Sequence, residues 1–279
     1  MTTKPLVAAT DGSEESLRAV EWAVHEAVLH GAPLRIVAAA ELLPRMHGPA
    51  GVAGVDTVAD ILRKNRDHAL DAAVKRATAI SPRLVIDADP LSGPVAQAVT
   101  DSGSGALMLV VGSRGSGAFA AMILGSVSRY AATHASCPVA VIRDETTPPH
   151  RLIVVGIRDA DSARDALAFA FEEAAQRQAA LTAVHAWHAP EAAAAKDAVA
   201  RQLADLLADW QAKYPGVLVS QEVANGHPGR VLAGLSARAD LTVLGGHAPH
   251  GARTVTHAVL NHAHGPVVTV PASPREVQS

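Results

Sequence analysis

The chain has 279 residues, of which 49% are hydrophobic and 18% charged, with a formal net charge of −3. This is the composition of a folded protein, and the length suits one large domain or two of ordinary size. No basic stripe stands out, so nucleic acid is not expected as the main partner. No apolar run is long enough to span a bilayer, so a membrane partner is not expected either.

The single cysteine, Cys137, excludes an intrachain disulfide and favours a reducing compartment. Because it precedes Pro138 in an apolar context, we interpret it as a small buried hydrophobe rather than a reactive thiol. Residues 1–5 lack a basic segment followed by an apolar one. We therefore expect no signal peptide and a cytoplasmic protein.

Apolar runs and amphipathic segments alternate along the first half of the chain. Strands are predicted near Leu6–Ala9, Leu34–Ala39, Leu84–Ala88, Ala106–Val111 and Val139–Ile142. Helical periodicity lies between them, as in Ser16–His30, Val58–Ala79 and Ser126–His134. Nearly continuous apolar strands separated by helices predict a parallel sheet covered on both faces, which is the doubly wound α/β class.

The second half of the chain repeats the first. The segment IVVGIRDA at 153–160 follows the pattern of LVAATDGS at 6–13, and the endings that start at His134 and His262 also correspond. The stretch 146–150, with two consecutive prolines, is interpreted as a linker. We therefore predict two domains, residues 1–146 and 151–279, each a five-stranded, mainly parallel sheet flanked by helices.

A glycine pattern follows the fourth predicted strand. Gly112 and Gly115 are followed by Gly125 and Ser126, which open a predicted helix. Glycines let the backbone approach a ligand closely, and a helix N-terminus offers N–H groups to an anion. Ligands of open α/β sheets bind outside the carboxyl ends of the strands, where Asp11 also falls. The pattern predicts a phosphate-binding site.

Other phosphate loops fit this sequence less well. A Walker A loop needs a lysine followed by Ser or Thr, and no lysine lies between Lys75 and Lys196. The segment GSGAFA at 115–120 matches the dinucleotide fingerprint loosely, but it follows the fourth strand rather than the first. The remaining interpretation is a flexible turn without a ligand. The pair Gly125-Ser126 argues against it, because it coincides with the start of a predicted helix.

Because of the glycine pattern and Asp11, the first half resembles a universal stress protein domain of the nucleotide-binding kind. The family pattern Gly-x2-Gly-x9-Gly-Ser/Thr is matched by Gly112, Gly115, Gly125 and Ser126. The family's aspartate after the first strand is matched by Asp11. The ending His134–Val139 is also similar. The resemblance covers nearly the whole chain as two tandem domains, and it implies an adenine nucleotide alpha hydrolase-like, Rossmann-like fold.

The resemblance implies an ATP site in the first domain, with or without Mg²⁺. The aspartate would contact the ribose or adenine, the main chain after the second strand would contact the adenine edge, and the glycine loop and helix start would hold the phosphates. ATP is not distinguished here from AMP or a cyclic nucleotide. The residues assigned to the site are Thr10, Asp11, Ala39, Gly112, Arg114, Gly115, Gly125, Ser126 and Val127.

The second half departs from this pattern. Arg158 stands in the place of the aspartate and cannot accept a hydrogen bond from a ribose. The sequence GGHA at 245–248 replaces the second motif glycine by alanine, and Arg253-Thr254 replaces the Gly-Ser pair. We predict that the second domain has lost the ATP site and forms an intramolecular pseudo-dimer with the first. Binding of another anion by these arginines, and a homodimer of chains, stay open.

Candidate catalytic groups are sparse. His247-x-x-His250 and His262-x-His264 have metal-like spacing, but no cysteine and few carboxylates accompany them, so we interpret them as surface and helix-end histidines. No hydrolase triad is evident, so we expect no enzyme beyond slow ATP hydrolysis. The glycine-rich segment 41–56 is either a cover for the nucleotide or an insertion.

The function predicted is that of an ATP-binding sensor or regulator in stress adaptation. Two alternatives stay open. One is a nucleotide-free scaffold or chaperone-like interaction protein, and the other is an enzyme or metal protein that uses the histidine-rich second domain.

Overall fold

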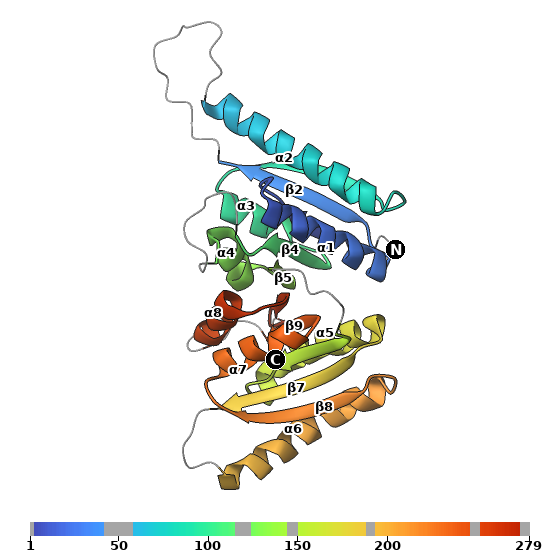
Figure 1. The fold of residues 1–279 in the computed structure, drawn as a ribbon, viewed down its shortest axis with the longest axis vertical. Helices are drawn as coiled ribbons and strands as arrows, with labels where there is room; N and C mark the ends of the chain where they lie inside the picture. The colour runs from blue at the N-terminus through green and yellow to red at the C-terminus, as the bar shows by residue number, and fades with distance from the viewer. Residues whose placement is uncertain are drawn as a thin grey trace, which may run out of the picture. The chain divides into compact units, whose positions relative to one another are not determined.

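The computed structural model describes residues 3–41, 58–114, 124–143, 150–187, 193–245 and 252–273. Strands and helices alternate along these ranges, and each half of the chain contributes five strands (Figure 1). The α/β class and the mainly parallel pairing are confirmed. In the part of the chain that the structure describes, no helix is long and apolar enough to cross a membrane.

The elements of the first half begin with β1 and end with β5. They are β1 (Leu6–Ala9), α1 (Glu14–His30), β2 (Leu34–Ala40), α2 (Val58–Ile80), β3 (Ile86–Ser92), α3 (Val95–Ser102), β4 (Met108–Gly112), α4 (Ser126–His134) and β5 (Val139–Ile142). The second half has the same order with one added 3₁₀ turn. Its elements are β6 (Leu152–Gly156), α5 (Ala160–Arg177), β7 (Ala180–Trp187), α6 (Ala193–Lys213), β8 (Val219–Asn225), α7 (Pro228–Leu235), the turn Ser236–Arg238, β9 (Leu241–Gly245), α8 (Ala252–His262) and β10 (Val267–Val270).

The first compact unit contains four parallel strands in the order β3-β2-β1-β4. The chain moves in one direction from β1 to β3 and then crosses back to β4. Because each crossover is right-handed, α1 and α2 lie on one face of the sheet, and the helices after β3 lie on the other. In agreement, α1 packs on α2 and α3 packs on α4 (Figure 1). The reversal beside β1 is the point where such folds bind ligands.

The second compact unit repeats this arrangement. Its strand order is β5-β10-β9-β6-β7-β8, and every pairing is parallel except that of β5 with β10. By sequence β5 closes the first repeat, but its backbone pairs with β10, with Val141 opposite Val267 and Ala140 opposite Val268. The chain therefore passes from the first compact unit to the second at residue 138, ahead of the proline-rich stretch at 146–150.

Helix α1 is bounded by residues with clear local roles. Ser13 is its N-cap and accepts a hydrogen bond from the Ser16 N–H, and two glutamates follow in the first turn. Gly31 ends the helix in the left-handed conformation, with φ of 60°. Helix α1 packs on the neighbouring strands β1 and β4, and both strands are buried. The start of α1 is thereby fixed beside the end of β1.

Two strand predictions were wrong at their ends. The third strand was predicted over Leu84–Ala88, but β3 pairs with all of β2, from Ile86 opposite Leu34 to Ser92 opposite Ala40. It runs through Pro90, which has no backbone N–H, and an edge strand tolerates proline where no neighbouring strand needs that donor. The fourth strand starts at Met108 rather than Ala106, since the Ala106 N–H donates to Gly103 in the preceding turn.

Candidate functional site

A cavity of about 250 Å³ opens at the carboxyl ends of β1, β2 and β4, within the first unit. Eight of the nine predicted site residues line it, and the ninth, Gly115, lies outside the described residues. The segment 42–57, which holds nearly all of the glycine-rich stretch, is also outside them. The lining consists of Ala9, Thr10, Asp11, Ser16, Ala39, Val95, Val99, Val111, Gly112, Arg114, Gly125, Ser126, Val127 and Ser128.

Asp11 lies in the turn between β1 and α1, exposed at the cavity edge. Its Oδ1 accepts hydrogen bonds from the Ser13 N–H, at 3.0 Å, and from the Ser13 hydroxyl, at 2.6 Å. The intervening Gly12 has a φ of 82°, which favours glycine. The carboxylate therefore organises the helix start as well as facing the cavity, so its local role and a ligand-binding role are compatible.

The buried hydroxyls of Thr10 and Ser16 stabilise this turn by hydrogen bonds. Thr10 Oγ1 lies 3.0 Å from Ser16 Oγ and accepts from the Gly12 N–H at 3.1 Å. The Thr10 N–H donates to Val37 of β2 at 2.9 Å. Sequence analysis included the threonine but missed Ser16, which is only 4% exposed. Its place three residues after the N-cap serine is the signal that could have identified it.

Gly112 ends β4 directly against the first turn of α1. A Cβ atom there would lie 3.1 Å from the Glu15 carbonyl oxygen and 3.2 Å from that of Arg114. Such contacts are tighter than ordinary packing and involve backbone atoms that cannot swing away. The sequence interpretation assigned this glycine to phosphate contact, but the structure shows that the approach of β4 to α1 already requires it.

The ends of the loop between β4 and α4 are held together by two hydrogen bonds. The Gly125 N–H donates to the Ser113 carbonyl at 2.8 Å, and the buried Ser128 hydroxyl donates to the Gly112 carbonyl at 2.5 Å. The first turn of α4 therefore lies beside the end of β4. Its N–H groups, including those of Ser126 and Val127, have no partner within the helix and carry the positive end of its dipole.

Arg114 adds a positive charge to the same end of the cavity. Among the described residues, its buried Nε has no hydrogen-bond partner. A buried donor without a partner is costly, and an anionic group in the cavity would supply an acceptor. The donor set of guanidinium and helix-start N–H groups therefore fits a phosphate.

Part of the cavity lining is apolar. It is formed by Val95 and Val99 of α3 and by Val111 of β4. Sequence analysis missed these valines, although a spacing of four residues at the start of a helix places two of them on one face. A cavity with one polar, cationic end and one apolar wall can hold a phosphate-bearing molecule with a flat apolar ring.

Cys137 is buried, with 4% of its surface exposed, and burial raises its pKa to about 11. Its Sγ lies 2.9 Å from the position that a Cβ on Gly103 would occupy. A thiol that stays protonated at neutral pH is unreactive. The interpretation of Cys137 as a structural hydrophobe is confirmed.

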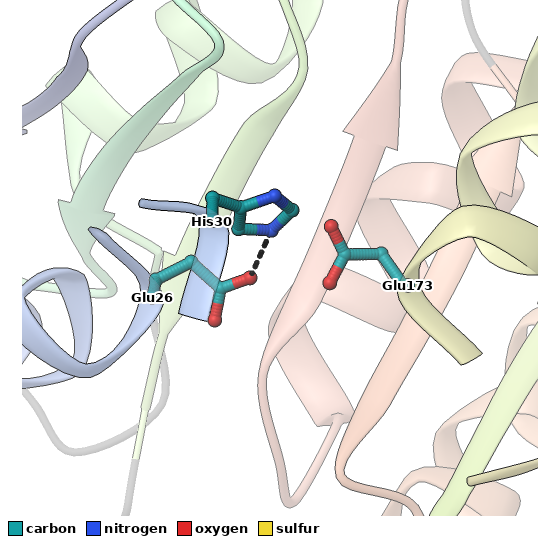
Figure 2. A group of neighbouring side chains, drawn as sticks. All are labelled: Glu26, His30 and Glu173. Carbon is teal, nitrogen blue, oxygen red and sulfur yellow. Dashed lines mark hydrogen bonds and ion pairs between the residues drawn. The ribbon is translucent and has the colours of Figure 1, made fainter. Parts of the chain in front are cut away.

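Each repeat has a glutamate paired with a basic residue on its first helix, away from the cavity. In α1, His30 Nε2 lies 3.1 Å from Glu26 Oε1 (Figure 2), and in α5, Arg177 lies 3.0 Å from Glu173. Both pairs are spaced four residues apart, the spacing at which helix side chains meet. They occupy the same place in the two repeats, and none of the four residues lines the cavity.

Two of the four histidines with metal-like spacing, His262 and His264, are described, and the backbone N–H of His264 donates to the Ser236 hydroxyl at 2.9 Å. Elsewhere in α8, His257 Nδ1 lies 3.1 Å from Asn261 Nδ2. His247 and His250 lie outside the described residues. His134 is stacked on Tyr130 with 4.1 Å between ring centroids, which is a structural contact at the end of α4.

A doubly wound unit with a cavity at the carboxyl ends of its strands, beside a helix start, defines a Rossmann-like domain. The model of the Universal stress protein family matches residues 2–143 and again residues 150–271. The chain therefore belongs to the universal stress protein family, as a tandem member with two copies of the domain.

Relatives of similar length support this membership. The chain is 35% identical to universal stress protein Rv2005c of Mycobacterium tuberculosis, over 94% of this chain and 95% of the relative. It is 31% identical to universal stress protein Rv2623 of the same species, over 86% and 85%. A crystal structure of a universal stress protein from Archaeoglobus fulgidus has a TM-score of 0.72 over 97% of both chains, at 16% identity, which shows the shared fold.

Proposed function

We propose that the first unit binds ATP and that nucleotide occupancy makes the protein a sensor or regulator in stress adaptation. The observation that carries the proposal is the cavity itself, which is lined by eight of the nine predicted site residues, among them Arg114, whose buried Nε has no hydrogen-bond partner in the described part of the chain. Asp11 would accept hydrogen bonds from the ribose, and the valine wall would pack on the adenine. The start of α4 and the guanidinium would hold the phosphates, with Mg²⁺ carried by the phosphate oxygens.

A regulatory role suits the lining better than an enzymatic one. Among the described residues of the cavity, Asp11 is the single carboxylate, and its Oδ1 already accepts two hydrogen bonds. A general base must reach the water that it activates, and no histidine lines the cavity in the described ranges. Slow hydrolysis is therefore the most that we propose.

The remaining assignments follow from this site. All the lining residues come from the first unit, so a homodimer of chains is not needed to complete it. We propose that residues 1–146 and 151–279 arose as two domains and that the protein works in the cytoplasm. ATP is available there, and a lone thiol stays reduced.

Denaturing the purified protein and identifying the released molecule by mass spectrometry tests the proposal first. We expect about one ATP per chain, or, for protein freed of nucleotide, a rise in melting temperature on adding ATP with Mg²⁺. Arg114→Ala should weaken binding about tenfold, because it removes a charge-assisted contact to phosphate. Arg158→Ala, at the place of Asp11 in the second repeat, is the matched control and should leave ATP affinity unchanged. No nucleotide and no shift would support the scaffold alternative instead.

A further inference from the structure

The second unit has its own cavity, of about 150 Å³, at the carboxyl ends of β6, β7 and β9. We infer that it binds a small organic anion with an apolar body, such as an aromatic or short-chain carboxylate, and not a nucleotide. The inference concerns a different unit and a different ligand from the ATP site, so either can fail without the other.

The two cavities occupy the same place in the repeated fold. The Ile157 N–H donates to the Val184 carbonyl at 2.8 Å, as the Thr10 N–H does to Val37 at 2.9 Å. Ala186 lines the second cavity where Ala39 lines the first. The second cavity is therefore a retained site with altered walls, not an accidental gap in packing.

The altered walls are more apolar. Ile157 replaces Thr10, so the buried hydroxyl that organised the first cavity is missing, and Leu232 and Leu244 stand in the places of two valines. The strand end makes room for the larger side chains, because a Cβ on Gly156 would lie only 2.8 Å from Leu232 Cδ1. Burying a ribose or phosphate against such walls would leave polar groups unpaired, which is unfavourable.

The charge at the cavity edge is reversed. Arg158 stands where Asp11 stands in the first repeat and lines the cavity with its side chain half exposed. Its Nε donates to Asp159 at 2.5 Å, which orients the guanidinium while using one of its five N–H donors. The fork of a guanidinium matches a carboxylate, so the anionic end of a ligand would lie here and its apolar body would enter the cavity.

The size of the cavity limits the ligand. An apolar protein cavity of this volume is large enough for a benzene ring. Benzoate therefore combines the ring and the charge that the site would recognise, and benzyl alcohol is a neutral counterpart of the same shape. For so few atoms we expect a dissociation constant of about 1 mM.

Titration of the full chain with benzoate, followed by ligand-detected NMR and calorimetry, tests the inference. Ala186→Leu fills the cavity and should abolish benzoate binding, whereas Ala39→Leu, the matched change in the first unit, should leave it intact. Arg158→Gln lies on the surface and is expected to fold. It should weaken benzoate about fivefold, as for an exposed ion pair, and leave benzyl alcohol unchanged.

Three outcomes would overturn the inference. They are no benzoate binding at millimolar concentration, binding that Ala186→Leu does not affect, and a second equivalent of ATP that Ala186→Leu removes. Loss of ATP binding alone, with benzoate binding retained, would refute the proposed function and leave this inference standing.

Discussion

Gly112 shows how a residue of a ligand motif can also serve packing. Its missing side chain lets β4 meet the first turn of α1, where the Glu15 carbonyl would be 3.1 Å from a Cβ. We expect Gly112→Ala to lower the free energy of unfolding by about 1–3 kcal/mol, because neither backbone can move aside cheaply. Urea unfolding without nucleotide measures this.

The matched control is Gly125→Ala in the same motif. The nearest atom to its Cβ would be 3.4 Å away, which is ordinary contact, and its φ of −60° suits alanine. Because Gly125 is the N-cap of α4, where glycine is preferred to alanine, this variant should lose at most about 1 kcal/mol, less than Gly112→Ala. Equal losses in both variants would contradict the packing role of Gly112.

Cys137 makes stability depend on pH in the alkaline range. Burial raises the thiol pKa from 9.0 to about 11, so the folded protein holds its proton where the unfolded chain has lost it. The contribution of the thiol to the free energy of unfolding is therefore fully present below about pH 9. It falls by about 3 kcal/mol as the pH rises to about 11. Urea unfolding across this range, compared with Cys137→Ala, isolates the effect from other titrating groups. Equal slopes for the two proteins would contradict the assignment.

At the residue scale, sequence reasoning identified residues that line the cavity but missed two serines that support them. The glycine–hydroxyl pattern pointed to Gly112, Gly125 and Ser126, which all line the cavity. Ser16 and Ser128 were missed for different reasons. The Ser16 hydroxyl pairs with Thr10 within one local turn, so its spacing from Ser13 could have identified it. The Ser128 hydroxyl donates to the Gly112 carbonyl of another segment, and such a partner becomes visible only when the chain has folded.

At the scale of elements, the start of α1 couples helix stability to the site. Ser13 caps the helix and also donates its hydroxyl to Asp11 at 2.6 Å. We expect Ser13→Ala to cost about 1 kcal/mol, the usual value of an N-cap. Ser13→Thr keeps the hydroxyl and should lose little. Hydrogen exchange in the first turn of α1 reports the difference directly, and unchanged protection in Ser13→Ala would show that the cap is dispensable.

The order of elements could be predicted from periodicity, and their ends could not. The doubly wound class followed from alternating apolar and amphipathic segments, because each type has its own repeat. The end of β3 depended on its register with β2, which carries the strand past Pro90. Edge position, and not local propensity, decides whether a strand tolerates proline.

At the scale of the whole molecule, duplication has let the two units diverge. Repeat-equivalent backbone hydrogen bonds are kept, such as those of Thr10 and Ile157, while the side chains around them differ in polarity and charge. Backbone geometry is held by the core of the sheet, but a cavity wall at the ends of the strands is free to change. One fold thereby carries two cavities with different chemistry.

The place of β5 has a consequence for the isolated first half. Its four residues are buried, and their backbone pairs with β10 of the second unit. A fragment of residues 1–146 keeps this apolar strand but lacks β10, and an unpaired edge of this kind recruits another strand.

We therefore expect the fragment to dimerise through antiparallel β5 pairing. Light scattering after size-exclusion chromatography would show twice the fragment mass at micromolar concentration. The control is Ala140→Pro in the same fragment, which removes a backbone N–H from β5 and should be monomeric. A monomeric 1–146 fragment, or a dimer of the proline variant as well, would rule out pairing through β5.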